Sequence, residues 1–185
     1  MYITCGLPAS GKTKTSEQVA RITGFRILRS DLLRLEILRN EDVFDERVAS
    51  DMGKRYQVYD EMFRLTDQLC AKGEDVILDA TFVSQALRKR AAEIAAKYGK
   101  NFFIQEILCP DEVCLRRIRQ RSKGHYESNA ISEEAYHNNK RRYEKVDLKE
   151  IVRDYPGLEI HFFQVDTSKD SLHEWRVVEK TVLCK

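Results

Sequence analysis

An eight-residue segment near the start of the chain constrains its fold more than any other feature. Residues 6–13 read Gly-Leu-Pro-Ala-Ser-Gly-Lys-Thr and match GxxxxGK[ST] at every position, with a short apolar run before them and a helical pattern after them. Its two glycines can adopt backbone angles that a Cβ atom would forbid, so successive N–H groups can point inward at phosphate oxygens. The segment predicts a phosphate-binding turn between a strand and a helix, rather than a glycine-rich turn that carries Lys-Thr by chance.

Each part of this turn has an expected role in binding a nucleoside triphosphate. Lys12 can reach the β- and γ-phosphates, and the Thr13 hydroxyl can ligate Mg²⁺. The N-terminus of the following helix adds about half a positive charge. The expected nucleotide-binding residues of the turn and the first helical turn are Gly6, Leu7, Pro8, Ala9, Ser10, Gly11, Lys12, Thr13 and Thr15.

Short β-type runs alternate with longer helical runs along the chain, which is typical of βαβ units around a parallel sheet. The predicted strands are 2–5, 26–29, 75–78, 102–108 and 159–165. The predicted helices are 12–23, about 46–72, 85–98, one that Asp111 caps and that runs through Ile118, and about 132–144. With 185 residues, of which 42% are hydrophobic, the chain is expected to form one α/β domain over residues 1–185.

Composition excludes several classes of protein. The 32 basic and 30 acidic residues give a net charge of +2, which argues against coating nucleic acid by bulk charge. Apolar runs are too short for a membrane-spanning helix, and the first residues lead directly into the turn, so neither a membrane association nor a signal peptide is expected. The five cysteines are odd in number and include no CxxC pair, which predicts neither a disulfide framework nor metal ligation and favours the cytoplasm.

Two acidic residues are expected where strands end, at the sheet edge where ligands of open α/β sheets bind. Asp31 follows strand 26–29 and could accept a proton from an attacking hydroxyl group or orient that group. Alternatively, Asp31 only caps a helix that begins at Leu32. Arg34, three residues later, could hold an anionic group of the acceptor. Asp79 ends an apolar strand as a Walker B acid does, so Thr13 and Asp79 are the candidate Mg²⁺ ligands. Asp79 could instead orient Arg34 or the acceptor, or simply begin a turn.

A basic stretch covers residues 116–123, in which five of the eight residues are Arg or Lys. Arg117 and Arg121 are four residues apart and would face the same way on a helix. This spacing suits a lid over residues 116–131 that closes on the triphosphate, although a solvated helix face or a nucleic-acid contact would also explain it. No Asn-Lys-x-Asp sequence is present, which argues against a GTPase.

The order of these segments resembles the small P-loop kinases. The resemblance rests on Gly6–Thr13, Ser30-Asp31-x-x-Arg34, Asp79-Ala80-Thr81 and the arginine-rich stretch. The order looks like that in the kinase part of the phage polynucleotide 5′-hydroxyl kinase family. It also looks like that in the wider set of predicted ATP-dependent kinases that includes zeta toxins and chloramphenicol phosphotransferase. The stretch 121–126, which ends in Gly124-His125-Tyr126, resembles a segment of gluconate kinase.

This resemblance implies a three-layer P-loop NTPase fold with a five-stranded parallel sheet in the order 2-3-1-4-5. It implies that Asp31 is the general base, that Arg34 contacts the substrate, and that Arg117 and Arg121 act from the lid. It also implies that Asp166-Thr167-Ser168 lies near the adenine, although an ordinary turn would explain these three residues equally well. The expected catalytic residues are therefore Lys12, Asp31, Arg34, Arg117 and Arg121.

Together these features predict a kinase that uses ATP and Mg²⁺ to phosphorylate a hydroxyl group. The acceptor, a small molecule or a polynucleotide 5′ end, is expected to contact the helical region 32–72. Acidic residues at 41–51 disfavour a phosphodiester strand there, and the basic residues Arg47, Lys54 and Arg55 weaken that objection. An ATP-binding regulatory NTPase without an acceptor is the alternative. The sequence leaves the acceptor and the oligomeric state open.

Overall fold

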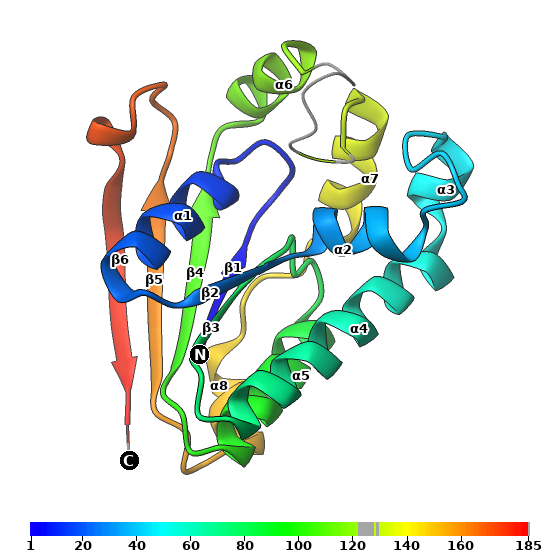
Figure 1. The fold of residues 1–185 in the computed structure, drawn as a ribbon. Coiled ribbons are helices and arrows are strands. Elements are labelled where there is room, and N and C mark those ends of the chain that lie inside the picture. Colours follow the sequence, from blue (N-terminus) through cyan, green and yellow to red (C-terminus); the bar gives the residue numbers. More distant parts are fainter. Residues whose placement is uncertain (122–127, 129, 185) are drawn as a thin grey trace.

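The structure is a computed structural model that describes residues 1–121, 128 and 130–184 (Figure 1). Within these residues, the sheet consists of β1 (Tyr2–Cys5), β2 (Arg26–Arg29), β3 (Val76–Asp79), β4 (Phe102–Leu108), β5 (Ile160–Asp166) and β6 (Arg176–Leu183). The first five strands are parallel in the order β2-β3-β1-β4-β5, and β6 joins β5 in the antiparallel direction. The predicted order is confirmed, but the prediction of a sheet of five parallel strands is wrong, because the described sheet is mixed and six-stranded.

The sixth strand escaped the sequence analysis because it buries almost nothing. Val177 and Val178 are 59% and 56% exposed, so the strand lacks the alternation of buried and exposed residues that marks a half-buried strand. It forms instead through main-chain pairing with β5, with an irregularity in register at Gln164/Val165. Such an edge strand is specified by its partner more than by its own pattern.

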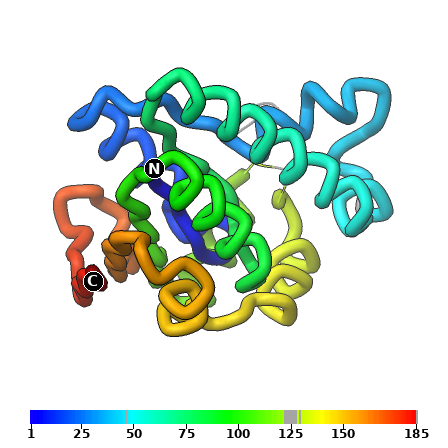
Figure 2. Tube along the Cα trace, turned by 90° about the horizontal axis from the view of Figure 1, so that it is seen from below, coloured from blue at the N-terminus to red at the C-terminus, as the bar shows by residue number. Residues whose placement is uncertain are grey.

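Helices cover both faces of the sheet (Figures 1 and 2). They are α1 (Lys12–Thr23), α2 (Ser30–Ile37), α3 (Glu46–Ser50), α4 (Met52–Ala71), α5 (Gln85–Lys97), α6 (Asp111–Arg119), α7 (Glu133–Arg142) and α8 (Leu148–Asp154), with a 3₁₀ turn η1 (Leu172–Glu174). The connections β1-α1-β2 and β3-α5-β4 run in opposite directions across the sheet. Because crossovers between parallel strands are right-handed, α1 lies on one face and α4, α5 and α8 lie on the other.

The core forms where α4, α5 and α8 meet the central strands. Ile3, Ile77, Leu78 and Ile104 are fully buried, as expected for parallel strands that are covered on both faces. Helix α5 presents small residues to the sheet, namely Ala91, Ala92 and Ala95, all fully buried. This close packing fixes the central strands and hence the positions of the loops at their carboxyl ends.

Two helix predictions need correction. The single helix predicted over about 46–72 is two helices, because Asp51 is extended and its carboxylate accepts from the Lys54 N–H at 3.1 Å, which starts α4 anew. The predicted cap of α6 is also wrong, because Pro110 occupies the N-cap position. Asp111 instead accepts a hydrogen bond from the Tyr136 hydroxyl at 2.7 Å, which joins α6 to α7.

Helix α8 was not predicted at all. Among the described residues, no helix combines the length and the apolarity that crossing a membrane requires.

Candidate functional site

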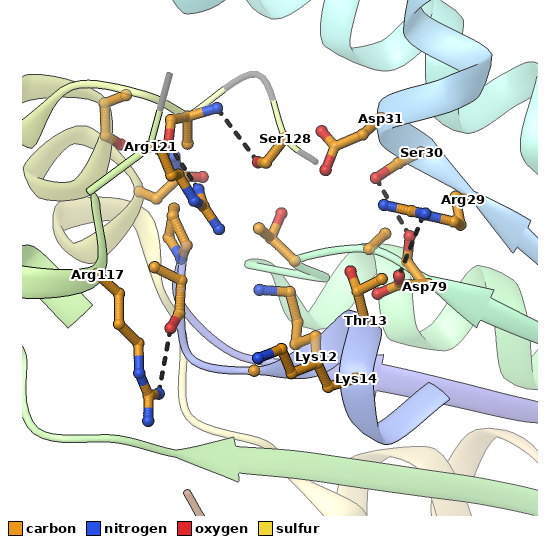
Figure 3. Close-up of a pocket in the computed structure, with 18 of the residues that line it drawn as sticks. Lys12, Thr13, Lys14, Arg29, Ser30, Asp31, Asp79, Arg117, Arg121 and Ser128 are labelled. Atoms are coloured by element: carbon orange, nitrogen blue, oxygen red, sulfur yellow. Dashed lines mark hydrogen bonds and ion pairs between the residues drawn. The ribbon is translucent and has the colours of Figure 1, made fainter. Parts of the chain in front are cut away.

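A cavity of about 760 Å³ opens at the carboxyl edge of the parallel strands (Figure 3). Its wall joins the turn between β1 and α1, the ends of β2 and β3, and helices α2, α4 and α7. Ligands of open α/β sheets bind at this edge, where strand ends and helix N-termini meet. The cavity contains all five residues that the sequence analysis expected to be catalytic, namely Lys12, Asp31, Arg34, Arg117 and Arg121.

The turn of residues 6–13 needs both of its glycines. Gly6 has φ +145°, and a Cβ atom there would lie 2.9 Å from the carbonyl oxygen of Ile107. Gly11 has φ +101°, and a Cβ atom there would lie 2.7 Å from Cη2 of Trp175. Both positions combine a backbone conformation that favours glycine with a close neighbour, so the turn is built without side chains at these points.

The turn presents only some of its residues to the cavity. Pro8, Ala9, Gly11, Lys12 and Thr13 line it. Other expected nucleotide-binding residues lie elsewhere: Gly6, Leu7 and Ser10 line a second hollow of about 540 Å³, and Thr15 does not line the cavity. The backbone of the turn is anchored from behind, since the hydroxyl of the buried Thr167 donates to the Ser10 carbonyl oxygen at 2.5 Å.

The Thr15 hydroxyl is used inside helix α1, where it donates to the Lys12 carbonyl oxygen at 2.7 Å. Lys12 itself folds back on the turn, and its Nζ donates to the Leu7 carbonyl oxygen at 2.7 Å. Desolvation lowers the pKa of this ammonium, while the negative charges of Asp79 and Asp31 oppose that effect. A phosphate oxygen could replace the neutral carbonyl and compensate the charge more fully.

Asp79 lies between the ends of two neighbouring strands. In the sheet register it stands beside Arg29 of β2 and Thr4 of β1, and the Thr4 hydroxyl donates to its Oδ1 at 3.3 Å. Its Oδ2 lies 3.8 Å from Arg29 Nε (Figure 3). Only 5% of Asp79 is exposed, and burial raises the pKa of its carboxyl group, opposed by a hydrogen bond with Thr13 and by the charge of Lys12.

Thr13 and Asp79 together offer a hydroxyl and a carboxylate oxygen, the hard ligands that Mg²⁺ prefers. In the part of the chain that the structure describes, no group of three or more His, Cys, Asp or Glu side chains gathers around a possible metal position. This pair therefore fits a Mg²⁺ ion that keeps its remaining sites for water and phosphate oxygens, as Mg²⁺ commonly does.

Asp31 projects from the first turn of α2 into the cavity (Figure 3). The alternative that Asp31 only caps a helix beginning at Leu32 is wrong, because α2 begins at Ser30 and Arg29 occupies the N-cap position. Asp31 is close enough to Asp79 and Lys12 for its charge to raise the pKa values of both.

The two lid arginines take different positions. Helix α6 ends at Arg119, so the expectation that Arg117 and Arg121 share a helical face is wrong. Arg117 donates to the carbonyl oxygens of Thr167 at 2.9 Å and Lys169 at 2.8 Å, and to that of Ala9 at 3.4 Å. Arg121 lies past the helix, and its positive charge lowers the pKa of Lys12. The Gly124-His125-Tyr126 segment lies outside the described residues.

Trp175 is a part of the site that the sequence analysis missed. It follows η1, its Nε1 donates to the Lys169 carbonyl oxygen at 2.8 Å, and its ring packs against Gly11. The Arg117 guanidinium lies 6.0 Å from the ring centroid. The only sequence signal was that the chain has a single tryptophan, and no motif connected it with the turn.

Helices α2, α3, α4 and α7 supply another part of the wall. Arg34, only 6% exposed, donates from Nη2 to the Val48 carbonyl oxygen at 2.5 Å. Arg55 of α4 donates from Nη2 to Oδ1 of Asn139 in α7 at 2.9 Å. Arg34 was expected here, whereas Arg55 and Asn139 carry no motif and come together only in the fold.

A family profile described as AAA domain matches residues 1–146. Among solved structures, a candidate kinase from Chloroflexus aurantiacus has a TM-score of 0.66 and 17% identity, over 90% of this chain and 87% of that one. A gluconokinase from Sinorhizobium meliloti has a TM-score of 0.58 and 18% identity, over 91% and 82%. Kti12 of Chaetomium thermophilum, in complex with ADP-AlF3, has a TM-score of 0.58 and 20% identity, over 78% and 80%. The predicted fold of the small P-loop kinases is confirmed.

Proposed function

We propose that this chain, which belongs to the AAA domain family, is a kinase that transfers the γ-phosphoryl group of ATP to a hydroxyl group. The observation that carries the proposal is that residues of the turn and Asp31 line the same cavity of about 760 Å³. A donor bound at the turn and an acceptor beside Asp31 would share this space. Similarity in fold to a gluconokinase and to Kti12, which was solved with ADP-AlF3, supports the same reading. We further propose that residues 1–185 form one domain that works in the cytoplasm, where free thiols persist.

In this proposal the triphosphate lies along the turn. Lys12 exchanges the Leu7 carbonyl oxygen for oxygens of the β- and γ-phosphates, which gives its charge a stronger partner. Arg121, whose charge already acts on Lys12, adds positive charge on the phosphate side. Arg117 and Trp175 form the rim beside Gly11 and contact the base end of the nucleotide.

Thr13 and Asp79 would hold Mg²⁺, which would supply positive charge to neutralise the phosphate oxygens. Arg29 and Thr4 keep the Asp79 carboxylate in place at the strand end. Burial disfavours the charged form of Asp79, so a cation at this point would compensate an existing cost of burial.

Asp31 positions the acceptor hydroxyl and takes its proton as the hydroxyl oxygen bonds to the γ-phosphorus. The bond between that phosphorus and the β–γ bridging oxygen breaks, and ADP leaves with this oxygen. Because such transition states are loose, placing the hydroxyl in line matters more than the basicity of the carboxylate. Arg34, which lies three residues from Asp31 on α2, contacts the acceptor.

The Asp31→Asn variant tests the assignment. It should abolish acceptor-dependent ADP release across a panel of hydroxyl compounds and 5′-hydroxyl oligonucleotides, while Mg²⁺-ATP still stabilises the protein against heat. The exposed Asp60→Asn on α4 is the matched control and should match the wild type. If ATP binding and turnover fell together, Asp31 would be a structural group or a metal ligand. If the wild type bound ATP but accepted no compound of a broad panel, the ATP-binding regulatory alternative would replace the kinase.

A further inference from the structure

Part of the cavity wall is formed by helices α2, α3, α4 and α7, which stand on the side of the molecule away from β5 and β6 (Figure 1). This part carries two arginines, Arg34 from α2 and Arg55 from α4. The amide of Asn139, from α7, stands beside Arg55 and orients it. The Asn139 Nδ2 donates to the Ala135 carbonyl oxygen at 2.7 Å, which leaves its Oδ1 to face Arg55.

Arg55 is held in place but its charge is not compensated. Its Nη2 bonds to a neutral amide, and its Nη1 is buried with no hydrogen-bond partner among the residues described. Across the same described residues, no carboxylate lies within 4.0 Å of its guanidinium. Desolvation lowers the pKa of Arg55; the neighbouring Tyr59 opposes this, and the positive charges of Arg142 and Arg34 add to it.

A partly desolvated guanidinium whose charge no carboxylate compensates costs free energy that a bound anion would recover. The planar fork of arginine suits the two oxygens of a phosphate or a carboxylate. We propose, building on the kinase function above, that the acceptor of the phosphoryl group is an anionic hydroxyl compound, whose phosphate or carboxylate Arg55 binds beside Arg34. This assigns to Arg55 the selection of the acceptor, a role separate from binding ATP.

The competing explanation is that Arg55 only ties α4 to α7 through Asn139. Two substitutions separate the explanations. Arg55→Met removes the charge, and Arg64→Met on the same helix is its control, since Arg64 is exposed, pairs with Glu61 and does not line the cavity. Asn139→Asp keeps the shape and the link to Arg55 but neutralises the guanidinium with a carboxylate, and Asn138→Asp is its control outside the cavity.

The experiment uses the full chain saturated with Mg²⁺ and the non-hydrolysable ATP analogue AMP-PNP, so that the turn cannot bind the added anion. The probes are glycerol, glycerate and glycerol 3-phosphate, and adenosine with adenosine 3′-monophosphate. Binding is measured by calorimetry, and ADP release is measured with ATP in place of the analogue. These pairs separate carboxylate from phosphate as the anion that the site prefers.

The expected result is that wild type and both controls bind the anionic member of at least one set about tenfold or more tightly than the neutral member. Arg55→Met and Asn139→Asp should lose that preference while they still bind AMP-PNP and unfold cooperatively. Equal binding of neutral and anionic probes, no binding of any anion, or an undiminished preference in Asn139→Asp would overturn the inference alone. Failure of the wild type to bind AMP-PNP would overturn the kinase proposal itself.

Discussion

Replacing Lys12 by methionine should remove most of the binding of ATP while leaving the free protein nearly as stable as before. In the free protein the Lys12 ammonium donates a hydrogen bond to the Leu7 carbonyl oxygen at 2.7 Å. Loss of that bond costs about 1 kcal/mol. Desolvation lowers the pKa of Lys12, so at neutral pH the charged form carries a cost in the folded state, which methionine avoids. The two effects oppose each other, and we expect the free energy of unfolding to change by about 1 kcal/mol or less.

The effect on ATP binding is larger. At a concentration 100 times its dissociation constant, ATP should stabilise the wild type by about 2.7 kcal/mol. For a chain of this size that corresponds to a rise in Tm of roughly 5–11 °C. Loss of a charge-assisted hydrogen bond worth about 1.5–3 kcal/mol weakens binding roughly ten- to hundredfold. With a hundredfold loss, the same ATP concentration stabilises Lys12→Met by only about 0.4 kcal/mol, a shift of roughly 1 °C.

The assay is thermal unfolding with Mg²⁺-ATP, with AMP and without nucleotide. Because Lys12 is assigned to the β- and γ-phosphates, the shift produced by AMP should be the same in both proteins. Lys72→Met, at the end of α4 and outside the cavity, should behave as the wild type with both nucleotides. A full ATP shift in Lys12→Met would refute the reasoning, since the turn would then not grip the triphosphate tail through its lysine.

Three further outcomes follow from the contacts. Gly11→Ala places a Cβ atom 2.7 Å from the Trp175 ring at a φ of +101°, so chemical denaturation should show a free energy of unfolding lower by about 1–3 kcal/mol. A variant as stable as the wild type would contradict this. Arg88 is 0% exposed and donates to the carbonyl oxygens of Glu144 at 2.6 Å and Lys145 at 3.2 Å, so Arg88→Met should cost about 2–4 kcal/mol in the same assay, and a loss below about 1 kcal/mol would argue against the reasoning. Trp175 is the single tryptophan, and its fluorescence should change when ATP binds and change less with inorganic triphosphate; an unaltered spectrum at saturating ATP would contradict its place at the base end.

The conformation of the turn at residues 6–13 could be predicted because its geometry is local. The positions of Gly6, Gly11, Lys12 and Thr13 are fixed by their spacing within one turn, and backbone sterics give the same conformation wherever that spacing follows a strand and opens a helix. The central strands could be predicted for a similar reason, because residues buried on both faces must be continuously apolar. The position of Asp79 at the carboxyl edge of the sheet could then be predicted, because this residue ends its strand.

The elements that escaped prediction depend on partners distant in the sequence. Strand β6 is defined by pairing with β5, and Trp175 reaches Gly11 only because the chain turns through η1 just before that strand. Nothing local to residues 169–184 encodes proximity to a turn more than 150 residues earlier, so a sequence pattern of period two or 3.6 cannot reveal it. The same holds for the break at Asp51, where a single cap outweighs an otherwise continuous helical stripe.

The part of the cavity wall that carries Arg34, Arg55 and Asn139 shows most clearly what the sequence cannot predict. It explains why the proposed phosphate site was foreseen and the proposed acceptor site was not. Arg55 and Asn139 are 84 residues apart and meet only because α4 and α7 face the same cavity. A triphosphate presents the same shape to every turn of this kind, so one local backbone solution recurs and leaves a motif. Acceptors differ in shape and charge, so the wall that selects them is assembled from helices whose side chains obey no shared spacing. If the proposal for Arg55 holds, the chemistry of that wall, above all an uncompensated guanidinium, determines which acceptor binds.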